Sequence, residues 1–457
     1  MKPVFSVLLA AWSAALAGAG KLPPVEVRGT AFVVAGQDRF YIRGIDYQPG
    51  GSSGGKDPLA NPAICRRDIE HFAELGINTI RVYMVDNSRK HDECMKLLDE
   101  AGIYLILDVN NPGYSINRAD PHKSYNTAYL KSIFATVNQF ARYNNTLAFF
   151  SGNEVINDDP GSEASAPYVK AVTRDIKNYL RTRGFRAIPV GYSAADVELN
   201  AIQVADYMNC GSDDMRSDFF AFNDYSFCNS DFETSRWREK VRTFSDYGIP
   251  ILYVELLLSE YGCIQSRPRK FDEMAALMSP AMTSVYSGGL LYEYSEESNN
   301  YGIVRIKGDA VEPLREFDSY RLALEQNPPP AGDGGAAHTT HARACPTLNE
   351  ETWDVDPSLV PEMPSQAERW MKAGITRGPG LRGGSQEAAD SGTASRSVTT
   401  GKPSPIRAAG GGAGGGSGGG DDGDEEDAAA VLERPCMTVV AVTGLVLLFG
   451  LLGVVAY

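Results

Sequence analysis

The sequence predicts a (β/α)8 barrel, because short apolar runs alternate with amphipathic stretches between residues 38 and 326. Eight apolar runs have the length and composition of strands: Tyr41–Gln48, Thr79–Val85, Tyr104–Asn110, Leu147–Glu154, Ala187–Tyr192, Phe219–Phe227, Ile251–Glu260 and Gly288–Ser295. Helix-like stretches lie between or after them: Cys65–Leu75, Glu93–Ala101, Leu130–Tyr143, Tyr168–Arg183, Thr234–Tyr247 and Pro313–Glu325. Strands that alternate with helices form a parallel sheet, and eight such units over roughly 250–300 residues suit a barrel. A doubly wound open sheet is the alternative.

The composition is that of an ordinary globular protein. Of the 457 residues, 43% are hydrophobic and 22% are charged, which excludes a fibrous or wholly disordered chain. Lys and Arg number 43 against 58 Asp and Glu, so the net charge is −15. Because no basic stripe is present, the sequence argues against nucleic acid as a partner.

The first 19 residues have the three parts of a secretory signal peptide. A positive start at Lys2 precedes the apolar run Val4–Ala11, which is too short to span a bilayer. Small residues follow, so cleavage is expected after Ala17 or Ala19. A buried N-terminal helix is the alternative. We therefore expect an exported protein.

The other end predicts a lipid anchor. Met437–Tyr457 is a charge-free apolar run with no basic residues after it, and Gly410–Gly420 and the acidic patch Asp421–Asp427 precede it. Small residues, a polar spacer and an apolar end are typical of a glycosylphosphatidylinositol attachment signal, here 428–457. The attachment residue is expected between Ser417 and Ala429. A retained single membrane span is the alternative.

Between barrel and anchor signal, the composition changes twice. The barrel is expected to occupy 20–326, and a linker with a C-terminal strap packed on the barrel 327–377, provided that Cys345 pairs back into the barrel. Residues 378–427 contain few large apolar side chains, so we expect a disordered, flexible stalk there.

The cysteines suit an exported protein. Cys436 lies beside the apolar tail, and six others remain: Cys65, Cys94, Cys210, Cys228, Cys263 and Cys345. An even number predicts three disulfides, with fifteen possible pairings. Asn144 begins an Asn-Asn-Thr sequence and is a candidate glycosylation site.

Two motifs resemble known binding sites but lack residues that those sites need. Gly50–Lys56 follows a strand and approximates a phosphate-binding loop, but Asp57 stands where Ser or Thr would bind magnesium. His338 and His341 have a metal-like spacing but lie in a Gly/Ala-rich linker without a further ligand. We expect neither a metal nor a cofactor.

A pair of glutamates at predicted strand ends indicates the chemistry. Phe149–Glu154 closes the fourth strand, and Leu256–Glu260 closes the seventh. Active sites of such barrels lie at the C-terminal ends of the strands, so both carboxylates would face one cleft. Glycoside hydrolysis uses two carboxyl groups, one protonated and one ionised. The alternative is that each acid merely pairs with a Lys or Arg.

Aromatic residues near the strand ends support a sugar site, because aromatic faces pack on pyranose rings. Seven tyrosines fall at strand ends or in the following loops, and about a third of them are expected to be core residues: Tyr47, Tyr83, Tyr114, Tyr225, Tyr292, Tyr294 and Tyr301.

Several motifs occur in a familiar order. They are Tyr47–Gly51, Ile80–Tyr83, Asp108–Asn110, Tyr114–Arg118, Gly152–Asn157, Ser259–Cys263, Tyr292–Tyr294 and Asn299–Gly302. With them the chain resembles the fungal β-1,3-glucanosyltransferases of glycoside hydrolase family 72, over about residues 22–385. The resemblance implies a (β/α)8 barrel that retains anomeric configuration.

The resemblance also implies roles for individual residues. Glu154 would be the general acid/base, Glu260 the nucleophile, and Asn153 the contact to the sugar 2-hydroxyl. The glucan groove would be lined by Tyr83, Asp108, Tyr225, Tyr292 and Tyr301. The family's disulfides would be Cys65–Cys94, Cys210–Cys345 and Cys228–Cys263. Because no cysteines lie between Cys345 and Cys436, the chain resembles the subgroup without a Cys-rich carbohydrate-binding module.

The seventh strand departs from the family pattern. Ile251–Leu258 is longer than the apolar segment that the family places between Ile-Pro and Ser-Glu-Tyr-Gly, and it adds Glu255 as a rival nucleophile. Because side chains alternate along a strand, Glu255 and Glu260 would point to opposite faces. The Tyr-Gly-Cys that follows Glu260 favours Glu260.

Three functions are compatible with these patterns. The first is a retaining transglycosidase that moves β-1,3-glucan from a donor to an acceptor chain at the cell wall, tethered to the outer face of the plasma membrane. Its carboxyl groups should lie ~5–5.5 Å apart, and Glu154 should have the raised pKa. The alternatives are a non-catalytic glucan-binding wall protein, inactivated by the longer strand, and a plain endo-β-1,3-glucanase.

Overall fold

The computed structural model describes residues 22–35, 38–51, 54–224, 227, 231–254, 267–349 and 351–386. Among them, eight parallel strands close into a barrel in the order β10-β11-β4-β5-β6-β7-β8-β9. Their bounds are β4 (Ile42–Asp46), β5 (Thr79–Val82), β6 (Tyr104–Asp108), β7 (Thr146–Asn153), β8 (Val190–Ala195), β9 (Phe219–Asn223), β10 (Ile251–Val254) and β11 (Tyr286–Leu291). Each lies within or overlaps one of the eight predicted strands. The predicted barrel is confirmed, and the open sheet is excluded.

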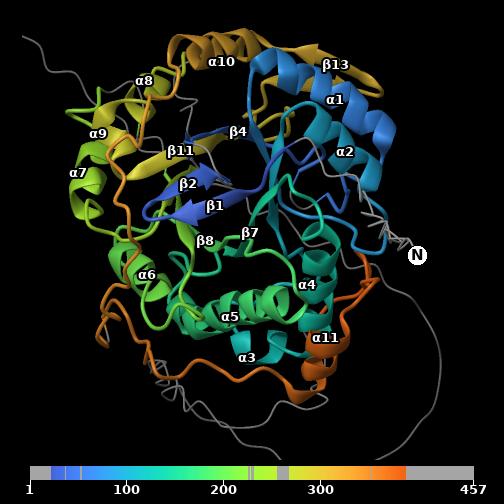
Figure 1. The fold of residues 1–457 in the computed structure, drawn as a ribbon, viewed down its shortest axis with the longest axis vertical. Helices are drawn as coiled ribbons and strands as arrows, with labels where there is room; N and C mark the ends of the chain where they lie inside the picture. Colours follow the sequence, from blue (N-terminus) through green and yellow to red (C-terminus); the bar gives the residue numbers. More distant parts are fainter. Residues whose placement is uncertain are drawn as a thin grey trace, which may run out of the picture. The chain divides into compact units, whose positions relative to one another are not determined.

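Helices surround the barrel strands (Figure 1). The six predicted helices correspond to α1 (Pro62–Leu75), α2 (Asp92–Glu100), α4 (Thr127–Phe140), α5 (Ala166–Thr182), α7 (Arg236–Thr243) and α10 (Arg315–Gln326). Shorter helices that the sequence analysis did not predict are α3 (Pro121–Ser124), α6 (Ala201–Met208), α8 (Glu273–Leu277), α9 (Pro280–Thr283) and α11 (Glu368–Ala373).

Capping residues explain where the helices begin. The side chain of Asn61 accepts a hydrogen bond from the Ala63 backbone N–H, and Pro62 occupies the first position of α1. The side chain of Asn126 accepts from the Tyr129 N–H in the same way at α4. Both asparagines satisfy a backbone donor that the first helical turn leaves free.

Strand periodicity separates two hydrophobic layers. On β6, Leu105 and Leu107 belong to the layer between strands and helices, whereas Ile106 points into the barrel. On β7, Phe149 faces the helices and Phe150 the interior. This alternation is the period of two expected of a strand, and both faces are apolar because helices cover the sheet.

A small antiparallel sheet, which the sequence analysis did not predict, covers the N-terminal end of the barrel. Its strands are β1 (Val25–Arg28), β2 (Ala31–Val34) and β3 (Arg39–Phe40). Phe32 packs on Phe219 at the start of β9, and Phe40 packs on Tyr104 at the start of β6. The interior is therefore closed at the end opposite the C-terminal strand ends. A hairpin of β12 (Val304–Lys307) and β13 (Ala310–Pro313) follows β11.

Two disulfides cross-link the described residues. Cys65–Cys94 joins α1 to α2, and Cys210–Cys345 joins the residues after α6 to the C-terminal segment. These two implied pairings are confirmed. The third, Cys228–Cys263, lies outside the described residues.

The C-terminal segment packs on the barrel beyond Cys345. Trp353 is fully buried and contacts Tyr207, and the Ile375 N–H donates to the Tyr179 hydroxyl. The segment continues past the expected boundary at residue 377, which is a correction to the stalk 378–427. Its backbone up to Ser385 is hydrogen-bonded to the barrel: the Gly378 N–H donates to the Asn87 carbonyl and the Ser385 N–H to the Gly113 carbonyl.

None of the helices within the described ranges is long and apolar enough to cross a membrane. The expected signal peptide, the rest of the expected stalk and the apolar run Met437–Tyr457 lie outside those ranges.

Candidate active site

The C-terminal ends of the barrel strands carry the polar residues of the site. Asp108 ends β6, Asn153 ends β7 and Asn223 ends β9, while Glu154 follows β7 directly. Because the strands are parallel, these ends meet at one side of the barrel, as they do in barrel enzymes. The fold thus brings together Asp108, Asn153 and Glu154, which the sequence analysis had singled out.

A buried arginine organises one half of the site. Arg81 on β5 is fully buried, and its Nε and Nη2 donate to the two carboxylate oxygens of Asp108 at 2.9 and 2.8 Å. The same Nη2 donates to Asn153 Oδ1 at 3.0 Å. The amide of Asn153 therefore keeps its N–H₂ group for another partner, which suits a donor to a sugar hydroxyl.

Glu154 is held by its backbone as well as its side chain. Its φ is +46°, a left-handed conformation that is rare for residues other than glycine. Its N–H donates to the Ser193 carbonyl at 2.9 Å, and its own carbonyl accepts from Arg118 Nη2 at 2.8 Å. Such over-determined backbone is concentrated at functional sites.

The Glu154 carboxyl has an environment suited to an acid. Burial raises its pKa above the usual value, although the Asn223 hydrogen bond and the charges of Arg81 and Arg118 oppose that effect. Asn223 Nδ2 donates to Glu154 Oε1 at 2.5 Å. A raised pKa is the direction expected for a residue that must begin its reaction protonated.

Three of the predicted tyrosines gather beside Arg81. Tyr83 and Tyr292 form a small cluster with the partly buried Tyr301, and the Tyr292 and Tyr301 ring centroids are 5.6 Å apart. The Arg81 guanidinium lies 4.5 Å from the Tyr83 ring centroid. Tyr225 and Glu260, and the rival Glu255, lie outside the described residues. The distance between the two proposed catalytic carboxyl groups therefore stays a prediction.

Comparison with known proteins identifies the family. The sequence profile of glycoside hydrolase family 72, described as glucanosyltransferase, matches residues 14–327. The 1,3-beta-glucanosyltransferase gel1 of Aspergillus fumigatus is 58% identical over 361 residues, which cover 79% of this chain and 78% of gel1. The 1,3-beta-glucanosyltransferase GAS5 of Saccharomyces cerevisiae is 47% identical over 372 residues, 80% of this chain and 75% of GAS5.

The chain belongs to glycoside hydrolase family 72. A solved structure agrees: a mutant of Saccharomyces cerevisiae Gas2p in complex with laminaritetraose and laminaripentaose superposes with a TM-score of 0.69 at 34% identity. The match covers 76% of each chain.

Other tyrosines belong to the core of this family 72 barrel. Tyr47 and Tyr294 are buried and donate to the two oxygens of Asp68 at 2.6 and 3.2 Å, so their hydroxyls face α1. Tyr114 donates to the Arg382 carbonyl of the C-terminal segment. Tyr47, Tyr114 and Tyr294 all lie in the hydrophobic core, which makes three of the seven strand-end tyrosines core residues where about a third was expected.

Sequence reasoning missed several polar residues of the site. Asn223, Ser193 and Arg118 contact Glu154 or its neighbours, yet none was singled out as a site residue. Asn223 closes an apolar strand as Glu154 does, so the same rule could have found it. The expected strand Phe219–Phe227 ran past it and hid that position.

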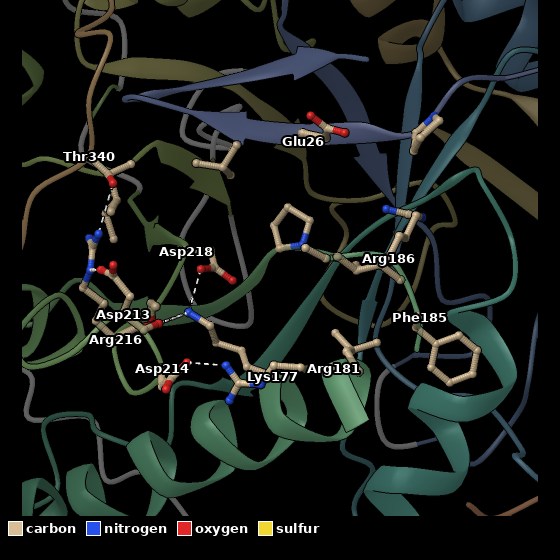
Figure 2. A pocket seen from close by; sticks show the side chains of 18 residues that line it. Glu26, Lys177, Arg181, Phe185, Arg186, Asp213, Asp214, Arg216, Asp218 and Thr340 are labelled. Atoms are coloured by element: carbon tan, nitrogen blue, oxygen red, sulfur yellow. Dashed lines mark hydrogen bonds and ion pairs between the residues drawn. The ribbon is translucent and has the colours of Figure 1, made fainter. Parts of the chain in front are cut away.

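A cavity of about 780 Å³ lies at the opposite end of the barrel (Figure 2). Its lining includes Glu26 of β1 and residues that precede β8, β9 and β10. Two of its cations are engaged with carboxylates, since Lys177 donates to Asp218 and Arg181 to Asp214, whereas Arg186 donates to backbone carbonyls such as that of Thr146. These pairs link α5 to the segment before β9, and we assign the cavity no part in the site. Within the described ranges, no three His, Cys, Asp or Glu side chains are grouped so as to hold a metal ion.

Glu293 follows β11 and should make stability depend on pH. Burial raises its pKa to about 7, and its Oε1 accepts a hydrogen bond from Asn299 at 2.9 Å. Because the folded-state pKa exceeds the unfolded value, the stabilising effect of the proton is full below pH ~4.5 and is lost as pH rises to about 7.

We therefore expect Glu293→Gln, which keeps the acceptor for Asn299, to stabilise the protein at pH 8 by at most about 3 kcal/mol. At pH 4 the variant should match the wild type. Urea unfolding of both proteins from pH 4 to pH 8 measures the difference. A difference that does not change with pH would contradict the assignment.

Proposed function

We propose that this protein is a retaining β-1,3-glucanosyltransferase that elongates cell-wall glucan. The observation that carries the proposal is the pairing of family membership with a largely buried carboxyl of raised pKa, Glu154, at the C-terminal end of β7. Asn153 and the tyrosines beside Arg81 supply the polar and aromatic groups that a glucan chain needs. The 1,3-beta-glucanosyltransferase names of the relatives support the same activity.

In the first step, Glu154 protonates the oxygen of the scissile bond while the Glu260 carboxylate attacks the anomeric carbon. The glycosidic bond breaks, a glycosyl–enzyme ester forms, and the reducing-end fragment leaves. In the second step, the Glu154 carboxylate removes the proton of an acceptor 3-hydroxyl, whose oxygen displaces Glu260. Two inversions give net retention, and Glu154 regains its proton. No cofactor takes part.

The proposal assigns Glu260 rather than Glu255 because Tyr-Gly-Cys follows Glu260, as in the motif that the chain shares with the family. Since side chains alternate along a strand, the two glutamates would point to opposite faces, and only one of them can meet the sugar.

Incubation of the soluble protein with a reduced laminari-oligosaccharide tests the function. Products longer than the donor support transfer. Shorter products alone would favour an endo-β-1,3-glucanase, and an unchanged donor would favour a non-catalytic glucan-binding protein. Product chain lengths read by mass spectrometry decide among the three.

We further propose that the protein is exported, glycosylated at Asn144 and held at the outer face of the plasma membrane by a glycosylphosphatidylinositol anchor. Asn144 is partly exposed in the turn before β7, which suits a glycan. The expected result is that Asn144→Gln abolishes the mass shift on deglycosylation. Phosphatidylinositol-specific phospholipase C should release the protein from membranes, whereas a retained span would resist it.

A further inference from the structure

The side-chain amide of Asn223 donates a hydrogen bond to one of the two carboxyl oxygens of Glu154. Its Nδ2 donates to Glu154 Oε1 at 2.5 Å, and it lies 3.4 Å from Asn153 Oδ1. Asn223 is fully buried at the end of β9, so water does not compete for this hydrogen bond. Apart from this amide, no other hydrogen bond to a side-chain oxygen of Glu154 is made from the described residues.

Ser193 sets which end of that amide faces Glu154. Its hydroxyl, also fully buried, donates to Asn223 Oδ1 at 2.8 Å. Asn153 supports the same orientation of the Asn223 amide. Its Oδ1 accepts a hydrogen bond from Arg81, so this oxygen faces Asn223 as an acceptor and requires the N–H₂ end of the Asn223 amide. With its oxygen engaged by Ser193, Asn223 presents N–H₂ to the carboxyl.

A carboxyl oxygen that accepts a hydrogen bond from an amide N–H keeps its lone pairs for that bond, so the acidic proton resides on the other oxygen. We infer that Asn223 is a positioning residue that keeps the transferable proton of Glu154 on Oε2, and that Ser193 holds the Asn223 amide in the orientation required. The inference deepens the proposed function and rests on Glu154 as its acid/base.

The hydrogen bond from Asn223 also lowers the pKa of Glu154. Donation to the ionised carboxylate favours that form, so removing Asn223 should raise the pKa of Glu154 further. Other groups that act on Glu154 are Arg81 and Arg118, which lower its pKa, and Asp158, which raises it; Tyr192 on β8 also faces it. These groups remain in an Asn223 variant, so a shift can be assigned to the amide.

Asn223→Ala should lower kcat/KM for an unmodified laminari-oligosaccharide by about 10- to 100-fold, the effect of one hydrogen bond to a charged group. Ser193→Ala should have a smaller effect of the same kind. Ser151→Ala is the matched control, because that buried hydroxyl on β7 contacts Thr173 and the Gly191 carbonyl rather than Asn223. It should leave activity and its pH profile unchanged.

Two readouts separate positioning from a structural role. The alkaline limb of kcat/KM, where Glu154 loses its proton, should move to higher pH in Asn223→Ala. It should move further in Asn223→Asp, which keeps the shape but substitutes an acceptor. In a burst assay with a dinitrophenyl laminarioside, whose leaving group needs no proton, Asn223→Ala should release dinitrophenol as fast as the wild type.

Unshifted limbs, or an equal loss with the dinitrophenyl donor, would overturn the inference. If Asn223→Ala does not fold, Ser193→Ala carries the same comparisons against Ser151→Ala. Full activity of Glu154→Gln would instead overturn the proposed assignment of the acid/base. The two failures are thus distinct.

Discussion

Glu154→Gln is expected to lower transfer between unmodified glucan chains by about 10²- to 10⁴-fold, the range for loss of a general acid/base. Glutamine keeps the oxygen that accepts from Asn223 Nδ2, so the hydrogen-bonded frame around residue 154 should persist. What it cannot do is give or take the proton. The fall in rate then measures chemistry rather than folding.

Two reagents that bypass the proton transfers show which catalytic step is slowed in the variant. A dinitrophenyl laminarioside should restore the first step in Glu154→Gln, and added azide, which needs no base, should trap the intermediate as a β-glucosyl azide. Glu260→Gln should lose activity with both donors, since no ester can form. Glu255→Gln should stay near the wild type. An inactive Glu255→Gln with an active Glu260→Gln would move the nucleophile to Glu255.

Arg81→Met is expected to be the most destabilising substitution near the site. It leaves the buried Asp108 carboxylate without its bidentate partner, and breaking a buried ion pair costs about 3–5 kcal/mol. It also releases Asn153, so affinity for glucan should fall. The double variant Arg81→Met/Asp108→Asn should recover part of the stability, because no unpaired charge remains.

The pH dependence identifies the cause of that loss. Burial already raises the pKa of Asp108, and Arg81 opposes this, so removing Arg81 raises the pKa further. The deficit should therefore be largest near pH 7 and shrink as pH falls, until it is smallest below pH ~3.8, where the carboxyl is protonated in the folded and the unfolded state. Arg81→Lys, which keeps the charge, should lose less. Urea unfolding measures all three; a deficit independent of pH would indicate lost packing instead.

The barrel could be predicted because each of its strands and most of its helices have a characteristic local sequence pattern. An apolar run such as Tyr104–Asp108 and the amphipathic helix that precedes it can be recognised from neighbouring residues alone. The sheet β1–β3 could not, since its strands are short and gain their stability from distant aromatic partners such as Phe219 and Tyr104.

The site divides in the same way. Glu154 could be found because it closes a strand, and the family resemblance supplied Asp108 and Asn153. The residues that position these side chains could not be found in the same way. Ser193 is hydrogen-bonded to Asn223, 30 residues away in the sequence, and Arg118 to Glu154, 36 residues away. Such hydrogen bonds depend on the closure of the barrel, which no local pattern contains.

The last described residues have a mechanical consequence. The Gln386 side chain donates to the Ser115 backbone carbonyl, and the Ser385 N–H donates to the Gly113 carbonyl, so the last described residues are held against the loop after β6. That loop also carries Arg118, which holds the Glu154 carbonyl. A force applied to the chain beyond Gln386 would therefore act on this loop. Such a force would act on Glu154 through the hydrogen bond from Arg118 to its carbonyl.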